Sequence, residues 1–175
     1  HSLSGASRNR AVSEAISVGF RLIDTATIYG NEAYVGHGIA QSGIKRESLF
    51  ITSKLWVDDS GYEKTINAFE TSLEKLGLEY LDLYLIHRPR GDVKDSWQAM
   101  EALYKKGKIR AIGVSNFEPE QIEELLAEAS INPAVNQIET HVFFQQERSR
   151  EYLEKKEIQM EAWSPFAAGR NGIFN

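Results

Sequence analysis

The sequence of 175 residues is 42% hydrophobic and 26% charged, a composition that indicates one folded domain and excludes a disordered chain. Its net charge of -5, with acidic and basic residues interspersed, excludes a nucleic-acid-binding surface, and no apolar run approaches the roughly 20 residues that cross a bilayer. The absence of cysteine excludes disulfides, thiol nucleophiles and thiolate metal ligands, so we expect a cytoplasmic protein with neither a membrane nor a nucleic-acid partner.

Short runs rich in β-forming residues alternate with longer helical patterns along the chain. In chain order, the predicted elements are helix 8–18, strand 21–24, helix 32–42, strand 49–53, helix 62–76, strand 81–86, helix 94–106, strand 111–115, helix 119–129, strand 136–138, helix 147–156 and strand 159–163. Glycines that suit the left-handed last turn of a helix follow four of the helical patterns, at Gly19, Gly43, Gly77 and Gly107. No linker-like or low-complexity segment divides the chain, which predicts a single domain over residues 1–175.

The repeated strand-and-helix unit, about 30 residues long, builds both a (β/α)8 TIM barrel and an open doubly wound sheet. The dinucleotide motif of open sheets, G-x-G-x-x-G, follows none of the predicted strands. In a barrel the carboxyl ends of the strands converge on one mouth, and here those ends carry Asp24, Lys54, His87, Ser115, Asn116, Gln137 and Ser164. We therefore expect an α/β fold of the TIM barrel class with a functional site at that mouth.

Four side chains from the predicted loops form a set suited to carbonyl reduction: Asp24, Tyr29, Lys54 and His87. Hydride addition to a carbonyl produces an alkoxide that needs a proton, which the phenol of Tyr29 can supply. We expect the ammonium of Lys54 to lower the pKa of that phenol and the carboxylate of Asp24 to hold Lys54. An Asp, Lys or Tyr alone in a loop is usually a solvated surface residue, and a lone histidine more often has a core or capping role, but an ordered quartet at strand ends favours chemistry.

Short motifs that bear on identity follow one another between residues 8 and 174. They are Asp24 with Tyr29, Ile51-Thr52-Ser53-Lys54, Leu85-Ile86-His87, Ile112-Gly113-Val114-Ser115-Asn116-Phe117, Asn136-Gln137-Ile138-Glu139 and Ala162-Trp163-Ser164-Pro165. Together they resemble the aldo-keto reductase superfamily. The resemblance implies an oxidoreductase that reduces aldehydes or ketones to alcohols with NADPH, with NADH as a possible replacement.

The resemblance also implies a role for each matching residue. Tyr29 is the general acid, Lys54 and Asp24 tune it, and His87 orients the substrate carbonyl. The residues implied to contact the cofactor are Asp24, Ser115, Asn116, Gln137, Trp163 and Ser164. Among them, Trp163 would stack on the nicotinamide ring and Ser164 would lie near the pyrophosphate. Contacts to the substrate are implied for Trp56, His87 and Arg88.

The sequence departs from the family pattern at both ends of the barrel. It predicts about six of the eight strand-and-helix units, without a strand before helix 8–18 and without an eighth strand or the basic segment that binds the adenosine phosphate. We therefore expect a partial barrel, which leaves open a truncated polypeptide, a longer chain, or two chains that complete each other. Two open strand edges favour self-association. His141-Val142 also stands where many relatives have a proline after the histidine.

Two other functions compete with carbonyl reduction. A metal-dependent barrel hydrolase needs a histidine cluster, but the chain has four histidines and no H-x-H pair, so we expect no metal site. His37 and His141 have no partner at ligand spacing, which favours structural roles for both. The second alternative is a catalytically impaired, reductase-like subunit that binds cofactor or partners without turnover. The complete catalytic quartet argues against this alternative, and the missing adenosine phosphate segment argues for it.

Overall fold

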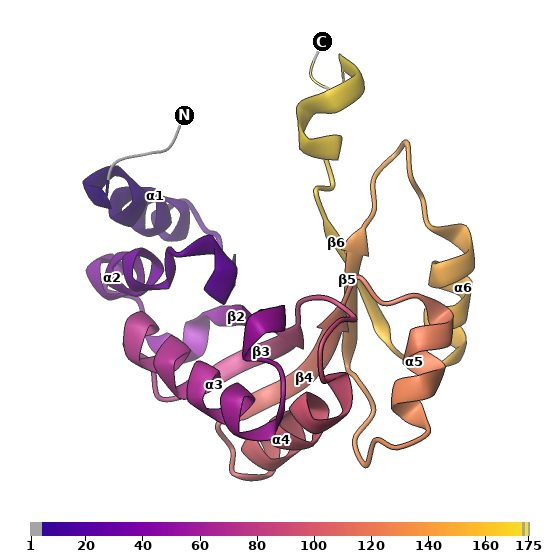
Figure 1. Ribbon diagram of the computed structural model, residues 1–175. Coiled ribbons are helices and arrows are strands. Elements are labelled where there is room, and N and C mark those ends of the chain that lie inside the picture. The colour runs from indigo at the N-terminus through magenta and orange to yellow at the C-terminus, as the bar shows by residue number, and fades with distance from the viewer. Residues whose placement is uncertain (1–4, 173, 175) are drawn as a thin grey trace.

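The computed structural model describes residues 5–172 and 174, and in this part of the chain six strands form one parallel sheet. The strands lie in the sheet in chain order and are β1 (Leu22–Asp24), β2 (Phe50–Leu55), β3 (Leu81–Ile86), β4 (Ile109–Ser115), β5 (Val135–Glu139) and β6 (Gln159–Trp163). Each strand pairs in parallel with the next one along the chain. The sheet curves like part of a barrel wall (Figure 1), which confirms the expected partial (β/α)8 architecture.

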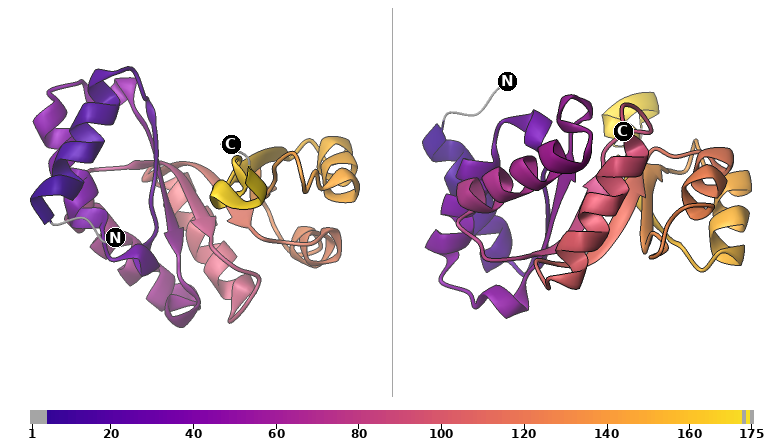
Figure 2. Two further views of the ribbon diagram at one scale, coloured as in Figure 1. Left: turned by 90° about the horizontal axis from the view of Figure 1, so that it is seen from above. Right: turned by 60° about the horizontal axis from the view of Figure 1, so that its bottom comes forward.

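Helices join the strands and cover the outer side of the curved sheet. They are α1 (Gly5–Ser17), α2 (Glu32–Ser42), α3 (Tyr62–Leu76), α4 (Val93–Lys105), α5 (Pro119–Leu126) and α6 (Glu147–Lys155). Figure 2 shows them from above as an arc outside the strands, with α1 and α2 at one end and α5 and α6 at the other. None of the helices in the described ranges is long and apolar enough to cross a membrane.

Two of the predicted glycine stops close their helices in the expected way. Gly43 after α2 and Gly77 after α3 have φ values of 67° and 65°, and each backbone N–H donates to a carbonyl of the last helical turn. A residue with a Cβ atom is strained in this conformation, so glycine is favoured there.

Helix α5 ends earlier than the predicted boundary at residue 129. After Leu126 the chain turns toward α4, where the backbone N–H groups of Ser130 and Ile131 donate to Oε1 of Glu101 at 2.7 and 2.8 Å. A buried carboxylate thus satisfies two backbone N–H groups of the loop that follows the helix. This long-range contact carries no periodic signal in the sequence.

Strand β2 extends beyond its predicted end at residue 53. Lys54 and Leu55 remain in register with Leu85 and Ile86 of β3, so Lys54 lies within the strand rather than after it. Its side chain is only 1% exposed. The charge suggested a strand end, but a carboxylate partner permits burial of the ammonium inside the barrel wall.

The main core lies between the sheet and helices α3 and α4. All six residues of β3 are buried, and the ring of Tyr84 packs edge-on against Phe69 of α3 at 5.2 Å between centroids. Trp97 of α4 is 1% exposed and donates its indole N–H to the carbonyl of Ile131 at 3.1 Å. Burial of each such aromatic side chain contributes about 2 kcal/mol. The core therefore fixes β3, which His87 follows directly, and its neighbour β2, which carries Lys54.

The edges of the sheet are less covered. In the described residues β1 and β6 each pair with a single strand, and Leu22 of β1 is 49% exposed. Exposed strand edges of this kind are what the sequence led us to expect. Self-association through them stays a prediction.

Candidate active site

A cleft of about 550 Å³ opens at the carboxyl ends of the strands. Among the residues that line it are Asp24, Tyr29, Trp56, His87, Arg88, Ser115, Asn116, Gln137, Trp163 and Ser164. These are all the predicted catalytic, cofactor-binding and substrate-binding residues except Lys54. The structure thus brings together side chains from loops that lie far apart in the sequence.

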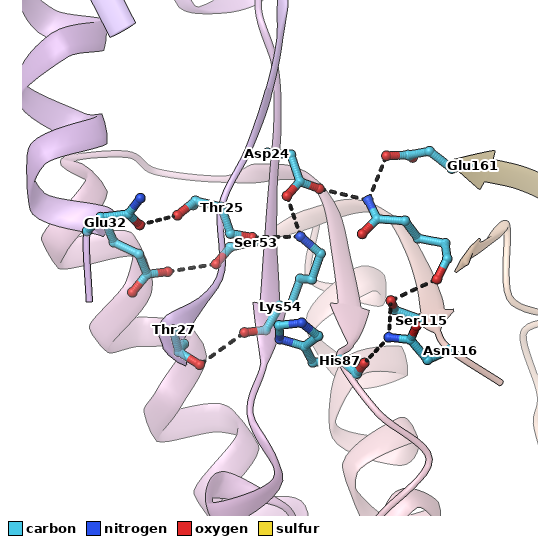
Figure 3. A network of polar contacts seen from close by, with 12 residues as sticks. Asp24, Thr25, Thr27, Glu32, Ser53, Lys54, His87, Ser115, Asn116 and Glu161 are labelled. Carbon is cyan, nitrogen blue, oxygen red and sulfur yellow. Dashed lines mark hydrogen bonds and ion pairs between the residues drawn. The ribbon is translucent and has the colours of Figure 1, made fainter. Parts of the chain in front are cut away.

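Lys54 contributes to the site from inside β2. Its Nζ atom forms an ion pair with Oδ1 of Asp24 at the end of β1 and donates to the carbonyl of Thr25 at 3.1 Å (Figure 3). The lysine side chain is 1% exposed whereas that of Asp24 is 29% exposed. The pair therefore joins two adjacent strands just beneath the cleft.

Tyr29 lies above this pair on a short 3-10 helix, Thr27–Tyr29. The Nζ atom of Lys54 is 5.4 Å from the centre of the Tyr29 ring, and the Oγ1 atom of Thr27 donates to the carbonyl of Lys54 at 3.1 Å. Strand β2 thus holds the loop that carries the phenol.

The pKa of Tyr29 differs from our expectation. Burial raises this pKa, the Asp24 carboxylate raises it further, and the Arg88 guanidinium opposes both effects. The predicted lowering by Lys54 is wrong for this arrangement, because Asp24 is paired with that ammonium and burial dominates. A raised pKa keeps the phenol protonated at neutral pH, which is the state that a general acid requires.

His87 follows β3 directly and faces two aromatic rings. Its imidazole contacts the rings of Tyr29 and Trp56 edge-on, with centroid separations of 5.7 and 5.2 Å. Burial is the main cause that lowers the pKa of His87, to about 4. The positive charges of Lys54 and Arg88 lower it further, and the negative charge of Asp24 opposes them. The imidazole is therefore neutral at neutral pH, with one ring nitrogen as a hydrogen-bond donor and the other as an acceptor.

Ser115 and Asn116 end β4 on the other side of the cleft. The Nδ2 atom of Asn116 donates to the carbonyl of His87 and to Oγ of Ser115, both at 3.0 Å, and its Oδ1 atom accepts from the indole of Trp163 at 2.8 Å. Asn116 has a φ of 62°, a left-handed conformation that asparagine tolerates better than most residues. One side chain therefore connects the loops after β3 and β4 with the end of β6.

Gln137 on β5 is connected to the catalytic pair. Its Nε2 atom donates to Oδ2 of Asp24 at 2.8 Å and to Oε1 of Glu161 at 2.7 Å, while Oγ of Ser115 donates to its backbone carbonyl at 2.8 Å. Figure 3 shows this chain of contacts running from Lys54 to Glu161.

Glu161 is a residue of this network that the sequence analysis did not predict. It lies in the middle of β6 among partly exposed residues, where an acidic residue reads as a solvated strand position. The signal that could have found it is its place in the strand next to Gln137, since the two are register partners.

The remaining predicted residues occupy peripheral or separate places. Trp56, Arg88 and Ser164 line the cleft, and Ser164 has a φ of 51°. His37 is exposed on α2, and His141 accepts from the backbone N–H of Phe143 at 3.2 Å and approaches Glu139 at 3.4 Å. Within the described ranges, no group of three or more His, Asp or Glu side chains is placed to hold a metal ion.

With this geometry in place, comparison with known proteins identifies the family. Residues 1–171 match the model of the Aldo/keto reductase family. The chain belongs to the aldo-keto reductases.

Curated relatives share close to half of the sequence or more. Glyoxal reductase of Bacillus subtilis is 56% identical over 167 residues, which cover 95% of this chain and 60% of that protein. The 9,11-endoperoxide prostaglandin H2 reductase of Trypanosoma cruzi is 52% identical over 166 residues, 94% of this chain and 59% of that protein. This aldo-keto reductase chain thus spans about 60% of the length of the curated relatives that it matches.

Solved structures agree with the fold. An aldo-keto reductase from Brucella melitensis superimposes with a TM-score of 0.92 at 47% identity, covering 96% of this chain and 67% of that one. The aldo-keto reductase of Bombyx mori in complex with NADP has a TM-score of 0.90 at 40% identity, covering 94% of this chain and 58% of that one.

Proposed function

We propose that this aldo-keto reductase chain carries the catalytic site of an enzyme that reduces aldehydes or ketones to alcohols with NADPH. The observation that supports it best is the joint placement of the Lys54–Asp24 ion pair, Tyr29 and His87 at one cleft. The glyoxal reductase of Bacillus subtilis, a relative, is named for a small carbonyl substrate, which supports the same substrate class here.

In this proposal Tyr29 is the proton donor. The carbonyl oxygen of the substrate lies against its hydroxyl group, and the protonated phenol gives up its proton as negative charge develops on that oxygen. Lys54, fixed by Asp24, lies 5.4 Å from the centre of the ring, and because Asp24 pairs with its charge the phenol stays protonated until negative charge develops on the carbonyl oxygen.

His87 orients the carbonyl group. Its neutral imidazole donates one hydrogen bond to the carbonyl oxygen without competing with Tyr29 for the proton. Trp56 packs against this imidazole and supplies an apolar wall that limits the access of water.

The chain has suitable groups for the nicotinamide end of a cofactor. The Oε1 atom of Gln137 has no hydrogen bond within the described structure, while both hydrogens of its amide are taken by carboxylates. This oxygen can accept from a carboxamide N–H, with Ser115 and Asn116 beside it and Ser164 nearer the pyrophosphate. Trp163, whose ring is fixed by its bond to Asn116, would stack on the nicotinamide. When bound, the cofactor supplies the hydride.

Oxidation of NADPH in the presence of an aldehyde panel tests this function, with NADH in parallel to measure the cofactor preference. A Tyr29→Phe variant should lose at least about 100-fold in kcat, because general acid catalysis contributes about that factor. Tyr62→Phe is the matched control, since Tyr62 is an exposed residue of α3 outside the cleft. Full activity in Tyr29→Phe would overturn the assignment, and NADPH binding without turnover by the unmodified chain would support the non-catalytic alternative.

A further inference from the structure

Arg88 is a charged residue of the cleft whose side chain is not committed to the protein. It follows His87 directly, is exposed and lines the same cleft as Tyr29. In the described part of the chain its guanidinium has neither a hydrogen bond nor an ion pair. Arg88 shares the cleft with Tyr29 and His87, the two groups that would hold the carbonyl oxygen, and its positive charge acts to lower the pKa of both.

Neither carboxylate of the cleft forms an ion pair with this guanidinium in the described structure. Asp24 is bonded to Lys54 and Gln137, and Glu161 accepts a hydrogen bond from the same Gln137 amide. Arg88 therefore keeps its fork of N–H donors free, and this fork matches the two oxygens of a carboxylate.

The backbone that carries Arg88 is held on both sides. The carbonyl of His87 accepts from Asn116 at 3.0 Å, and the carbonyl of Arg88 accepts from the N–H of Arg90 at 2.8 Å. The root of the side chain is thus fixed at the mouth of the cleft.

We propose that the cleft selects carbonyl compounds that also carry a carboxylate, with Arg88 binding the carboxylate while Tyr29 and His87 hold the carbonyl oxygen. This inference rests on the proposed carbonyl reduction. It adds a substrate class, the oxo acids, to which the guanidinium contributes binding rather than chemistry.

The first test compares matched substrates that differ in the carboxylate. Succinic semialdehyde is paired with butanal, and para-carboxybenzaldehyde with para-tolualdehyde. In the unmodified chain we expect kcat/KM to favour the acid of each pair, and in Arg88→Met this ratio should fall about tenfold, mainly through KM, as for loss of a hydrogen bond to a charged group. The Arg88 charge also acts on Tyr29 and His87, but this effect changes kcat/KM for both aldehydes of a pair. The ratio of the two kcat/KM values therefore isolates the contact with the carboxylate.

Two further variants sharpen this test. Arg88→Lys should recover part of the ratio, since it restores the charge without the fork. Arg90→Met removes a neighbouring exposed charge that does not line the cleft, and it should leave the ratio unchanged. An unchanged ratio in Arg88→Met, or an equal fall in Arg90→Met, would overturn the proposal.

A binding measurement separates this inference from the proposed function. Titration calorimetry of the chain with para-(hydroxymethyl)benzoate and with para-methylbenzyl alcohol needs no turnover. Tighter binding of the acid that is lost in Arg88→Met would support the inference even if no aldehyde were reduced. Equal binding of the two alcohols, or binding of neither, would refute it. The same titration with NADPH supplies a third outcome: if Arg88→Met lowers the affinity for NADPH alone, the inference is refuted and Arg88 is assigned to a cofactor phosphate.

Discussion

Glu161 and Gln137 are register partners on adjacent strands, and Oε1 of Glu161 accepts a hydrogen bond from the Gln137 amide at 2.7 Å. The second hydrogen of that amide is directed to Asp24 at 2.8 Å. The two carboxylates therefore fix which way the amide faces and leave its oxygen free. A residue of the proposed cofactor site is in this way aligned by the acid that also pairs with Lys54.

Removal of Glu161 should weaken binding of the nicotinamide end of the cofactor. In Glu161→Leu the Gln137 amide loses one bond to a charged group and can rotate, so we expect the dissociation constant of NADPH to rise about tenfold. Fluorescence titration with NADPH measures this change.

Glu161→Gln is the conservative control for this prediction. Its side-chain oxygen can still accept from Gln137, so NADPH affinity should stay within about threefold of the unmodified chain. If Glu161→Leu and Glu161→Gln bound NADPH alike, the orienting role of the carboxylate would be refuted.

The ion pair between Lys54 and Asp24 should respond unequally to removal of its two members. Asp24→Ala leaves an ammonium that is 1% exposed without its partner, and we expect a loss of about 3 kcal/mol in the free energy of unfolding. Lys54→Met leaves a carboxylate that is 29% exposed and still bonded to Gln137, so the loss should be about 1 kcal/mol or less. Urea unfolding of both variants measures the difference, and equal losses would contradict it.

The sequence was sufficient for the architecture because alternating periodicities and glycine stops are local signals. Strand β3 and helices α2 and α3 have the predicted bounds. The errors occur where distant partners act, as after α5, where Glu101 binds the backbone of the following loop, and in β2, where Asp24 permits burial of Lys54.

The site shows the same division between local and distant signals. Strand ends predicted that the four catalytic candidates come together, because parallel strands converge at their carboxyl ends; Asp24, Tyr29 and His87 line the cleft and Lys54 lies beneath it, paired with Asp24. The pKa of Tyr29 could not be predicted, since its main cause is burial, which depends on packing from several loops. Glu161 likewise becomes meaningful only when β5 and β6 lie side by side.

The imidazole of His87 should titrate well below an ordinary histidine. Burial and the charges of Lys54 and Arg88, opposed by Asp24, lower its pKa from 6.5 to about 4. Between these two values the unfolded chain binds a proton that the folded chain does not, so His87 makes the free energy of unfolding fall as the pH falls from about 6.5 to 4. Below that window its contribution becomes constant.

Two measurements check this behaviour. NMR titration of the imidazole should give the lowered pKa directly, and Arg88→Met should raise that pKa because one neighbouring positive charge is removed. In urea unfolding, His87→Gln should show a smaller loss of stability across the same pH window. A His87 pKa at or above the usual value would contradict the prediction.

Asn116 combines a left-handed backbone with three side-chain hydrogen bonds, and two substitutions separate these contributions. Both Asn116→Gly and Asn116→Ala remove the bonds to His87, Ser115 and Trp163. Alanine must also adopt a φ near 62°, which glycine does without strain, so Asn116→Ala should be less stable by about 1 kcal/mol. Urea unfolding of the two variants gives this difference. A glycine variant no more stable than the alanine variant would show that the backbone relaxes once the side-chain bonds are lost.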